Sequence, residues 1–276
     1  MTTEGLKFDR IGYWSEVKLD IVRKYAKAYS TIMTRKRLNH VYIDGFAGPG
    51  VNIARSTGKF VPGSPLNALN IEPKFNGFYF IDLDGDKVNH LRSLVGDRSD
   101  VHIFQGNCNE ILLEKIFPQI RYSDYRRGLC LLDPYGLHLN WEVIETAGKI
   151  RTIDLFLNFP IMDINRNALW RYPENVREDG IARMTAFWGD ESWRDMAYEK
   201  RLALFGNEDV KLCNEEVAAV FQKRLREKAE FRYVPTPVPM RNSRGAVVYY
   251  LYFASQQPVA EKIVTDIFTK YMHRGA

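Results

Sequence analysis

The 276-residue chain has few cysteines and lacks long apolar runs. Cys108, Cys130 and Cys213 lie far apart and form no CxxC pair, which argues against a zinc knuckle and a disulfide framework. No stretch reaches the ~20 apolar residues that a membrane-spanning helix needs. The first ten residues, MTTEGLKFDR, lack the apolar region of a secretory signal. We therefore expect a cytoplasmic protein without a membrane segment.

Several common catalytic motifs are also missing. The histidines are scattered and form no HExxH motif, so we expect no metal site. The absence of a GxxxxGK[ST] loop argues against an NTPase, and the absence of GxGxxG argues against a dinucleotide fingerprint. The net charge of +5 is compatible with a polyanionic partner but does not require one.

The apolar pattern predicts an α/β fold. Apolar residues at helical spacing predict a first helix over 13–37. Short apolar runs without strict alternation, typical of strands covered on both faces, follow at 40–46, 77–84, 100–107, 127–136 and 152–160. Helical patterns lie between them at 64–73, 85–96, 109–120 and 140–150. This strand–helix alternation predicts a doubly wound, mostly parallel sheet.

The C-terminal part departs from this alternation. Residues 161–210 are rich in tryptophan and arginine and predict an inserted helical lobe within a single domain, 1–276. A helix is predicted over 213–231 and another over 258–272. Between them, strands at 231–240 and 246–255 flank the turn RNSRG and predict a hairpin. It would place an antiparallel strand at the edge of the sheet.

The first predicted strand ends in an acid followed by glycines. In a doubly wound sheet, ligands sit beyond the carboxyl ends of the strands, where glycines let the backbone approach them. Asp44 ends the strand, and the segment DGFAGPG supplies Gly45, Phe46, Gly48 and Gly50. The alternative is an ordinary tight turn. The spacing is close to the acid-then-glycine loop of S-adenosylmethionine (SAM) methyltransferases.

Polar residues follow the next strands in turn. Asp82 ends the second strand, where a carboxylate can accept hydrogen bonds from both ribose hydroxyls. Asp84 can take that role instead, or cap the next helix. Asn107 follows the third strand and suits an adenine edge, or caps a helix. The fourth strand ends in LLDPYG, an acid followed by proline and an aromatic, which is the most specific element of the chain or else a plain turn.

Together these segments resemble the three-Cys-motif partner protein family. The resemblance covers roughly 10–160 and 210–272, through DGFAGPG, GSPLNAL, FYFIDLD, GNCNEIL, LLDPYGLHLNWEVI, DLFLNFP and YYLYFASQQP. It implies a Rossmann-like methyltransferase fold that binds SAM, and a partner protein that carries the three-cysteine motif. By the resemblance, the methionine and ribose side is lined by Asp44, Gly45, Phe46, Gly48 and Gly50. Asp82 then takes the ribose, and Asn107 sits near the adenine.

DPYG stands where amino-methylating enzymes carry Asp-Pro-Pro-aromatic, and it lacks the second proline. In such a motif the Asp133 carboxylate and the Pro134 carbonyl each accept one N–H of an exocyclic amine. Tyr135 can stack on a flipped base. The expected activity is SAM-dependent methylation of a nucleic acid, such as adenine N6. The alternatives are a methyltransferase-like accessory protein that acts through a partner in phage defence or mobile-element biology, and a nicotinamide-dependent dehydrogenase.

Three further segments keep two interpretations each. The loop 49–63 exceeds the usual 2–6 residues of a strand–helix connection, as lids and binding elements do. Asn158 either supplies an acceptor to a pocket or ends the fifth strand. The stretch 165–177 is either a surface for single-stranded nucleic acid or an amphipathic helix with a solvated face. It interleaves basic and aromatic side chains, namely Arg166, Trp170, Arg171, Tyr172 and Arg177.

Overall fold

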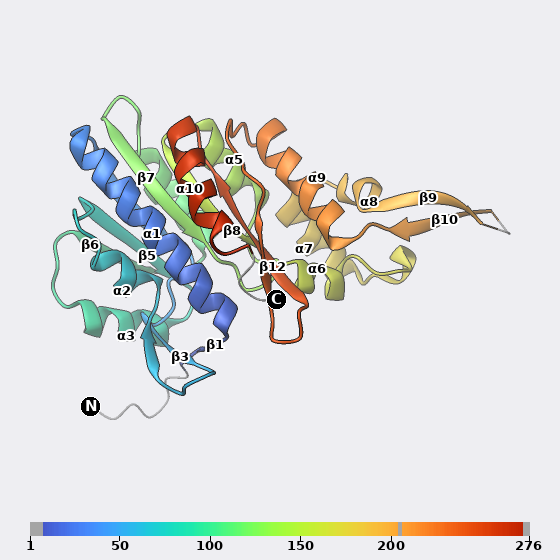
Figure 1. Cartoon of the computed structure of the whole chain (residues 1–276), viewed down its shortest axis with the longest axis horizontal. Helices are drawn as coiled ribbons and strands as arrows, with labels where there is room; N and C mark the ends of the chain where they lie inside the picture. Colours follow the sequence, from blue (N-terminus) through green and yellow to red (C-terminus); the bar gives the residue numbers. More distant parts are fainter. Residues whose placement is uncertain (1–7, 204–205, 273–276) are drawn as a thin grey trace.

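The computed structural model describes residues 8–203 and 206–272 (Figure 1). Its main sheet has the strand order β11-β12-β8-β7-β2-β5-β6. The bounds are β2 (Asn39–Asp44), β5 (Gly77–Asp82), β6 (Val101–Gln105), β7 (Arg126–Leu132), β8 (Ile153–Phe159), β11 (Val238–Arg241) and β12 (Val247–Ala254). Pairing is parallel from β8 to β6, whereas β12 is antiparallel to both β8 and β11. The predicted α/β fold with a mostly parallel sheet and an antiparallel C-terminal strand is confirmed.

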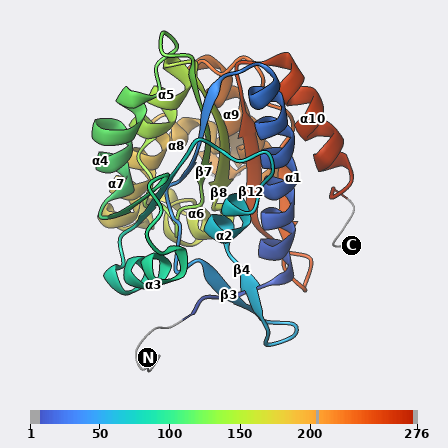
Figure 2. The same ribbon diagram turned by 90° about the vertical axis from the view of Figure 1, so that its left-hand side faces the viewer.

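Helices cover both faces of this sheet (Figure 2). One face packs against α1 (Tyr13–Arg35), α2 (Ser64–Leu69) and α10 (Pro258–Thr269). The other packs against α4 (Cys108–Ile111), α5 (Trp141–Lys149) and α9 (Asn214–Glu227). Successive strand residues point to opposite faces, so Tyr42 joins the first core while Val41 and Ile43 join the second. Burial on both sides explains the uninterrupted apolar runs of the strands.

Two predicted elements differ in detail. The hairpin of β11 and β12 forms, but β12 lies inside the sheet and β11 is the edge strand. The helix predicted over 109–120 is broken into α4, a π-helical turn η1 (Leu112–Ile116) and a 3₁₀ turn η2 (Phe117–Gln119). Pro118 lies in the second turn, and its missing N–H removes a bond that a regular helix would need.

The predicted helical lobe is helical only in its first part. It contains α6 (Ile161–Asn167), the 3₁₀ turn η3 (Pro173–Asn175), α7 (Glu178–Trp188) and α8 (Trp193–Met196). The helical prediction is wrong for 198–203 and 206–210, because β9 (Tyr198–Ala203) pairs antiparallel with β10 (Gly206–Lys211). Glu, Lys, Arg, Leu and Ala in β9 favour a helix in isolation, but cross-strand pairing overrides that preference. The hairpin projects from the body of the molecule (Figure 1).

The long loop after β2 forms a small sheet of its own. β3 (Val51–Ala54) pairs with β4 (Phe60–Pro62), and β1 (Arg10–Ile11) adds to β3 in parallel. This sheet lies at the end of the molecule near the carboxyl end of β2, beside the start of α1 (Figure 2). Within the described residues, none of the helices is long and apolar enough to cross a membrane.

Candidate functional site

The strand order reverses between β2 and β7. From β2 the chain runs outward through β5 and β6, and then returns to build β7 and β8 on the other side. The loops that leave β2 and β7 therefore diverge, which opens a crevice at the carboxyl ends of these two strands. Open α/β sheets bind ligands at this kind of point. Asp44 is the last residue of β2, and Asp133 directly follows β7.

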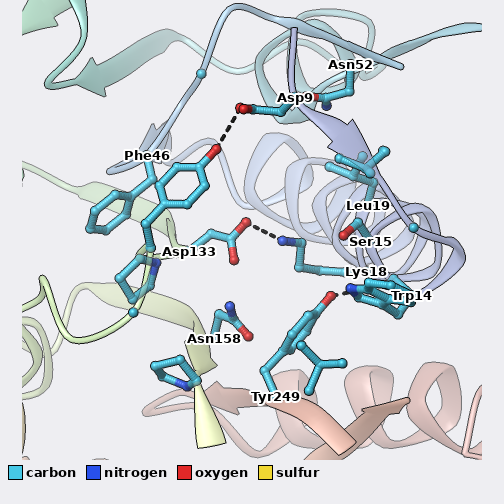
Figure 3. Close-up of a pocket in the computed structure, with 18 of the residues that line it drawn as sticks. Asp9, Trp14, Ser15, Lys18, Leu19, Phe46, Asn52, Asp133, Asn158 and Tyr249 are labelled. Carbon is cyan, nitrogen blue, oxygen red and sulfur yellow. Dashed lines mark hydrogen bonds and ion pairs between the residues drawn. The ribbon is translucent and has the colours of Figure 1, made fainter. Parts of the chain in front are cut away.

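A cavity of about 510 Å³ lies in this crevice (Figure 3). Its size falls within the usual 300–1,000 Å³ of small-molecule sites. Its wall includes Trp14, Ser15, Lys18 and Leu19 of α1, Phe46, Ala47 and Gly48 after β2, Asp133, Pro134, Tyr135 and Gly136 after β7, and Asn158 and Pro160 at the end of β8. Five of the predicted site residues thus share one cavity, namely Phe46, Gly48, Asp133, Pro134 and Tyr135. The other five lie outside its lining, namely Asp44, Gly45, Gly50, Asp82 and Asn107.

Asp44 lies directly beneath the glycine loop and is fully buried. Its Oδ1 accepts a hydrogen bond from the Phe46 amide at 3.2 Å. Its Oδ2 has no hydrogen-bond partner of ordinary geometry among the described residues. Burial raises the pKa of Asp44 to about 7, although the nearby Ser64 hydroxyl and the Phe46 amide both act to lower it. Asp44 is thus a carboxyl group that a cationic ligand would shift toward its charged form.

The parent chain is expected to lose stability as pH rises from 4 to 7, and replacing Asp44 by asparagine should remove this loss. The pKa of Asp44 in the folded chain is about 7 against 3.8 for a free carboxyl, so the folded state holds a proton that the unfolded state releases in this window. The free energy of unfolding therefore falls as pH rises from 4 to 7, by roughly 3–5 kcal/mol from this group. Urea unfolding at several pH values from 4 to 7.5 measures the difference.

Buried Asp154, whose pKa is raised by burial to about 6, contributes in the same direction. The informative quantity is therefore the difference between the parent chain and Asp44→Asn. The exposed Asp266→Asn variant is the control and should keep the parent pH dependence. Equal pH slopes for the parent and Asp44→Asn would show that Asp44 titrates normally.

The glycine loop is tied to the end of β5 by Asp82. The Gly48 amide donates to Asp82 Oδ2 at 2.8 Å, and the Asp84 amide donates to Oδ1 at 2.9 Å. Gly48 has φ +64°, and a Cβ there would meet no other described atom within 4 Å. At Gly45 and Gly50 a Cβ would lie 2.8 Å from a leucine side chain, and Gly50 also has a left-handed φ of +83°. Gly48 is therefore the glycine that leaves open space at the cavity wall.

Two predicted residues act as helix caps. Asp84 accepts the amides of Asp86 and Lys87 at the start of α3 (Gly85–Val95), which is the capping alternative for this residue. Asn107 is exposed and accepts the Asn109 amide at 3.0 Å at the start of α4. The ribose contact of Asp82 and the adenine contact of Asn107 stay predictions.

Asp133 is held by a residue that the sequence analysis missed. Lys18 of α1 donates to Asp133 Oδ2 in an ion pair, with only 8% of the lysine side chain exposed (Figure 3). The sequence contained an indication of this role, because Lys18 lies on the buried face of α1 with Ile21, Val22 and Tyr25. A lysine on an apolar helix face needs a partner, since burying an unpaired charge is costly. One oxygen of Asp133 remains outside this pair.

Asn158 places a second acceptor in the same cavity. It is the penultimate residue of β8, lines the cavity and is 7% exposed. Its Oδ1 is buried, and neither 8–203 nor 206–272 supplies it with a hydrogen-bond partner. Buried polar atoms are nearly always hydrogen-bonded, so this oxygen is a candidate ligand contact. Asn158 thus lines the pocket, and β8 ends one residue later at Phe159.

Tyr135 is bound to the segment that precedes α1. Its hydroxyl donates to Asp9 Oδ2 at 2.6 Å, and Lys87 of α3 donates to the same oxygen at 2.8 Å. The Lys87 ammonium also lies 5.1 Å from the centre of the Tyr135 ring. The ring is 60% exposed, so it keeps a free surface despite these contacts. Asp9, which lines the cavity just before β1, is therefore bound to both Tyr135 and α3.

Three exposed arginines also belong to the cavity wall. They are Arg10 of β1, Arg55 after β3 and Arg166 of α6. The Arg55 Nε donates to the Arg10 carbonyl at 2.9 Å, which joins two of them. The stretch 165–177 is not one amphipathic helix, because α6 ends at Asn167. Arg171, Tyr172 and Arg177 are exposed beyond it. Among the residues with described positions, no group of three His, Cys, Asp or Glu could hold a metal.

No protein-family model and no curated protein matches this chain. Solved structures with a similar fold include a Legionella pneumophila protein of the DUF519 family, with a TM-score of 0.46 and 14% identity over 94% of each chain. The methyltransferase domain of bacterial CtHen1-CN has a TM-score of 0.40 and 10% identity, over 85% of this chain and 99% of that one.

A SAM-dependent methyltransferase from Mesorhizobium loti has a TM-score of 0.35 and 9% identity, over 79% of this chain and 90% of that one. These likenesses are distant and assign neither an activity nor a substrate to this chain. None of the three structures bears the name of the three-Cys-motif partner family, so membership in that family stays a prediction from sequence.

Proposed function

We propose that this chain is a SAM-dependent methyltransferase that modifies an exocyclic amino group of a nucleic acid. The observation that carries the proposal is the meeting of two segments in one cavity. The glycine loop after β2 and the Asp133-Pro134-Tyr135 segment after β7 come from neighbouring strands at the switch point of the sheet. The glycine loop suits a cofactor, and the Asp133-Pro134-Tyr135 segment suits an amine.

The residues around the glycine loop fit SAM. SAM carries a sulfonium and an ammonium group, and this positive charge would draw the buried Asp44 carboxyl, which lies beneath the loop and has a pKa of about 7, toward its charged form. The open space at Gly48 allows close approach of a ligand to the backbone. The Asp82 carboxylate accepts hydrogen bonds from two backbone amides, and its remaining lone pairs can accept hydrogen bonds from the ribose hydroxyls. When bound, SAM supplies an electrophilic methyl group.

The other side of the cavity offers acceptors for an amine. The free oxygen of Asp133, the Pro134 carbonyl and Asn158 Oδ1 can receive N–H bonds, and Lys18 fixes the Asp133 carboxylate in place. Two acceptors would orient the nitrogen lone pair and stabilise the positive charge that develops on nitrogen. The N–C bond to the methyl group would form as the methyl–sulfur bond breaks, and S-adenosylhomocysteine would be the leaving group. The nitrogen then loses a proton to a carboxylate or to water. Alignment of this kind can lower a barrier by about 7–11 kcal/mol.

The arginines at the cavity mouth support a polyanionic substrate. Guanidinium groups bind phosphates well, and Arg10, Arg55 and Arg166 are all exposed. We expect the triple variant with alanine at these positions to bind substrate RNA or DNA at least about tenfold more weakly. The slope of log affinity against log salt should fall by about two to three. Fluorescence anisotropy across 50–200 mM salt measures both.

A matched control replaces three exposed basic residues away from the cavity, Arg23, Lys223 and Lys262. It keeps the same net charge as the rim variant, so a general charge effect would weaken both equally. An equal loss of affinity in the two triple variants would contradict a phosphate role for the rim.

Two measurements test the proposed activity. In thermal melting with SAM, S-adenosylhomocysteine, NAD and ATP, only SAM and S-adenosylhomocysteine should stabilise the chain. The free energy of unfolding should rise by about 2.7 kcal/mol when the ligand is at a hundredfold excess over its Kd. Transfer of a labelled methyl group from SAM to tRNA, rRNA, DNA or protein then identifies the substrate class. A shift with NAD alone would favour a dehydrogenase, and labelling of protein alone would refute the nucleic-acid substrate.

Two observations favour a second candidate, an accessory protein that acts through a partner. Lys18 already engages the carboxylate that an amine would need. The β9–β10 hairpin also projects from the body, and an isolated two-stranded hairpin is at best marginally stable alone. SAM binding without transfer to any substrate class, followed by transfer when a partner is added, would establish this role.

A further inference from the structure

A second cavity lies at the opposite edge of the sheet and is not part of the proposed methyltransferase site. It has a volume of about 380 Å³. Its wall includes the amino ends of β7 and β8, the C-terminal half of α1 and the start of α10. Its size falls within the usual range of small-molecule sites. The charged and aromatic side chains that line this cavity indicate which class of ligand it can bind.

Positive charge exceeds negative charge in the lining. Lys36, Arg127 and Arg151 contribute cations, while Asp154 is the acid among the described lining residues. Both oxygens of Asp154 are already engaged, because Tyr25 and Ser255 donate to them at 2.6 Å each. Of the three cations, Arg151 also lies 3.6 Å from the exposed carboxylate of Glu230, which is not part of the lining. Positive charge still exceeds negative charge when Glu230 is counted, which suits an anion, and guanidinium groups suit phosphate in particular.

Aromatic rings stand beside these cations. Tyr122 is 68% exposed and Tyr125 is 70% exposed, so both rings are accessible to a ligand from solvent. The Arg127 guanidinium lies 4.2 Å from the centre of the Tyr122 ring. Tyrosine rings and guanidinium planes are the surfaces on which nucleobases stack.

Two buried polar atoms of the same lining lack partners. Tyr29 is 3% exposed, and its hydroxyl has no hydrogen bond to any residue that the structure describes. The Gln256 amide nitrogen donates to the Gly148 and Glu230 carbonyls at 3.0 and 2.8 Å, which fixes the side chain. Its Oε1 is left without a donor in the described part of the chain. Unsatisfied buried groups are rare and mark a polar cavity that gains from a ligand.

We propose that this second cavity binds a nucleoside monophosphate. The base lies against the tyrosine rings and the Arg127 plane, and the phosphate faces Lys36 and Arg151. The unpartnered oxygens of Tyr29 and Gln256 give the floor of the cavity its polar character. The assignment does not depend on the proposed methyltransferase activity, because the two cavities share no lining residue.

Isothermal titration of the full chain with AMP, GMP, CMP and UMP tests the assignment. At least one nucleotide should bind, with at least about tenfold higher affinity than adenosine or inorganic phosphate alone. Tyr122→Ala and Lys36→Ala should each weaken binding about tenfold. Both side chains are exposed, so the fold should persist. The control Lys262→Ala, on the exposed part of α10, should bind as the parent does.

A nucleotide could also enter the first cavity, so the same titrations are made with Gly48→Leu, which alters that cavity alone. Unchanged nucleotide affinity in Gly48→Leu supports the second cavity. The proposal is overturned by no binding at millimolar nucleotide, by equal binding of phosphate or adenosine, or by affinity lost in Gly48→Leu and retained in Tyr122→Ala and Lys36→Ala.

Discussion

Replacing Asp133 by alanine is expected to reduce methyl transfer by at least about a hundredfold while SAM affinity changes little. The expected size is that of losing one preorganised polar contact to a group that develops charge, about 10²–10³ in kcat. The cofactor contacts are assigned to the loop after β2, on a different strand, which is why binding should persist. Transfer kinetics with the identified substrate, together with SAM titration, measure the two quantities separately.

The ion pair with Lys18 means that Asp133→Ala is expected to lower stability as well as activity. Removing Asp133 leaves the buried ammonium unpaired, which costs about 3–5 kcal/mol in comparable buried pairs. The double variant Lys18→Met with Asp133→Ala removes both charges and should recover stability without recovering transfer. Asp266→Asn, an exposed aspartate of α10, serves as the control for activity. Unchanged turnover in a folded Asp133→Ala chain would remove this residue from amine binding.

Replacing Gly48 by leucine is expected to weaken SAM binding by at least about a hundredfold. Gly48 is the glycine of the loop that faces open cavity space, so a leucine side chain would occupy the volume assigned to the cofactor. SAM titration by calorimetry measures the loss, and thermal melting reports the accompanying change in stability.

Gly58 provides a matched control for this variant. Its φ of +68° is close to the +64° of Gly48, and a Cβ there also meets no described atom within 4 Å. Gly58 lies between β3 and β4 and does not line the cavity. Both leucine variants therefore carry the same left-handed strain, about 1–2 kcal/mol. If Gly58→Leu weakened SAM binding as much as Gly48→Leu, backbone strain and not cavity filling would be the cause.

The predicted strands and the predicted site both follow from a parallel sheet that is covered by helices on both faces. Apolar runs become parallel strands, here of five to seven residues, when helices cover both faces, and parallel strands bring their carboxyl ends to one edge. That is why Gly48 and Asp133, 85 residues apart, could be assigned to one site before the fold was known. Asn107 was ambiguous because a cap and an adenine contact need the same side chain at the same place.

Residues that the sequence analysis missed reach the cavity through long-range contacts. Lys18 and Asp133 are 115 positions apart, and Asp9 and Tyr135 are 126 apart. No local pattern specifies such pairs, because they depend on how α1 and its preceding segment cross the edge of the sheet. The β9–β10 hairpin was missed for a related reason, since its helix-favouring composition is overridden by pairing between strands.

By itself, the sequence determined the α/β class, the approximate position of each strand of the main sheet and the polar residues at the strand ends. These follow from local hydrophobic pattern and from turn chemistry, which neighbouring residues encode. Only the tertiary structure decided that Lys18 neutralises Asp133, that three arginines share the cavity mouth, and that a second cavity opens at the other edge. Each of these depends on the packing of elements distant in the chain, where geometry and not composition selects the partner.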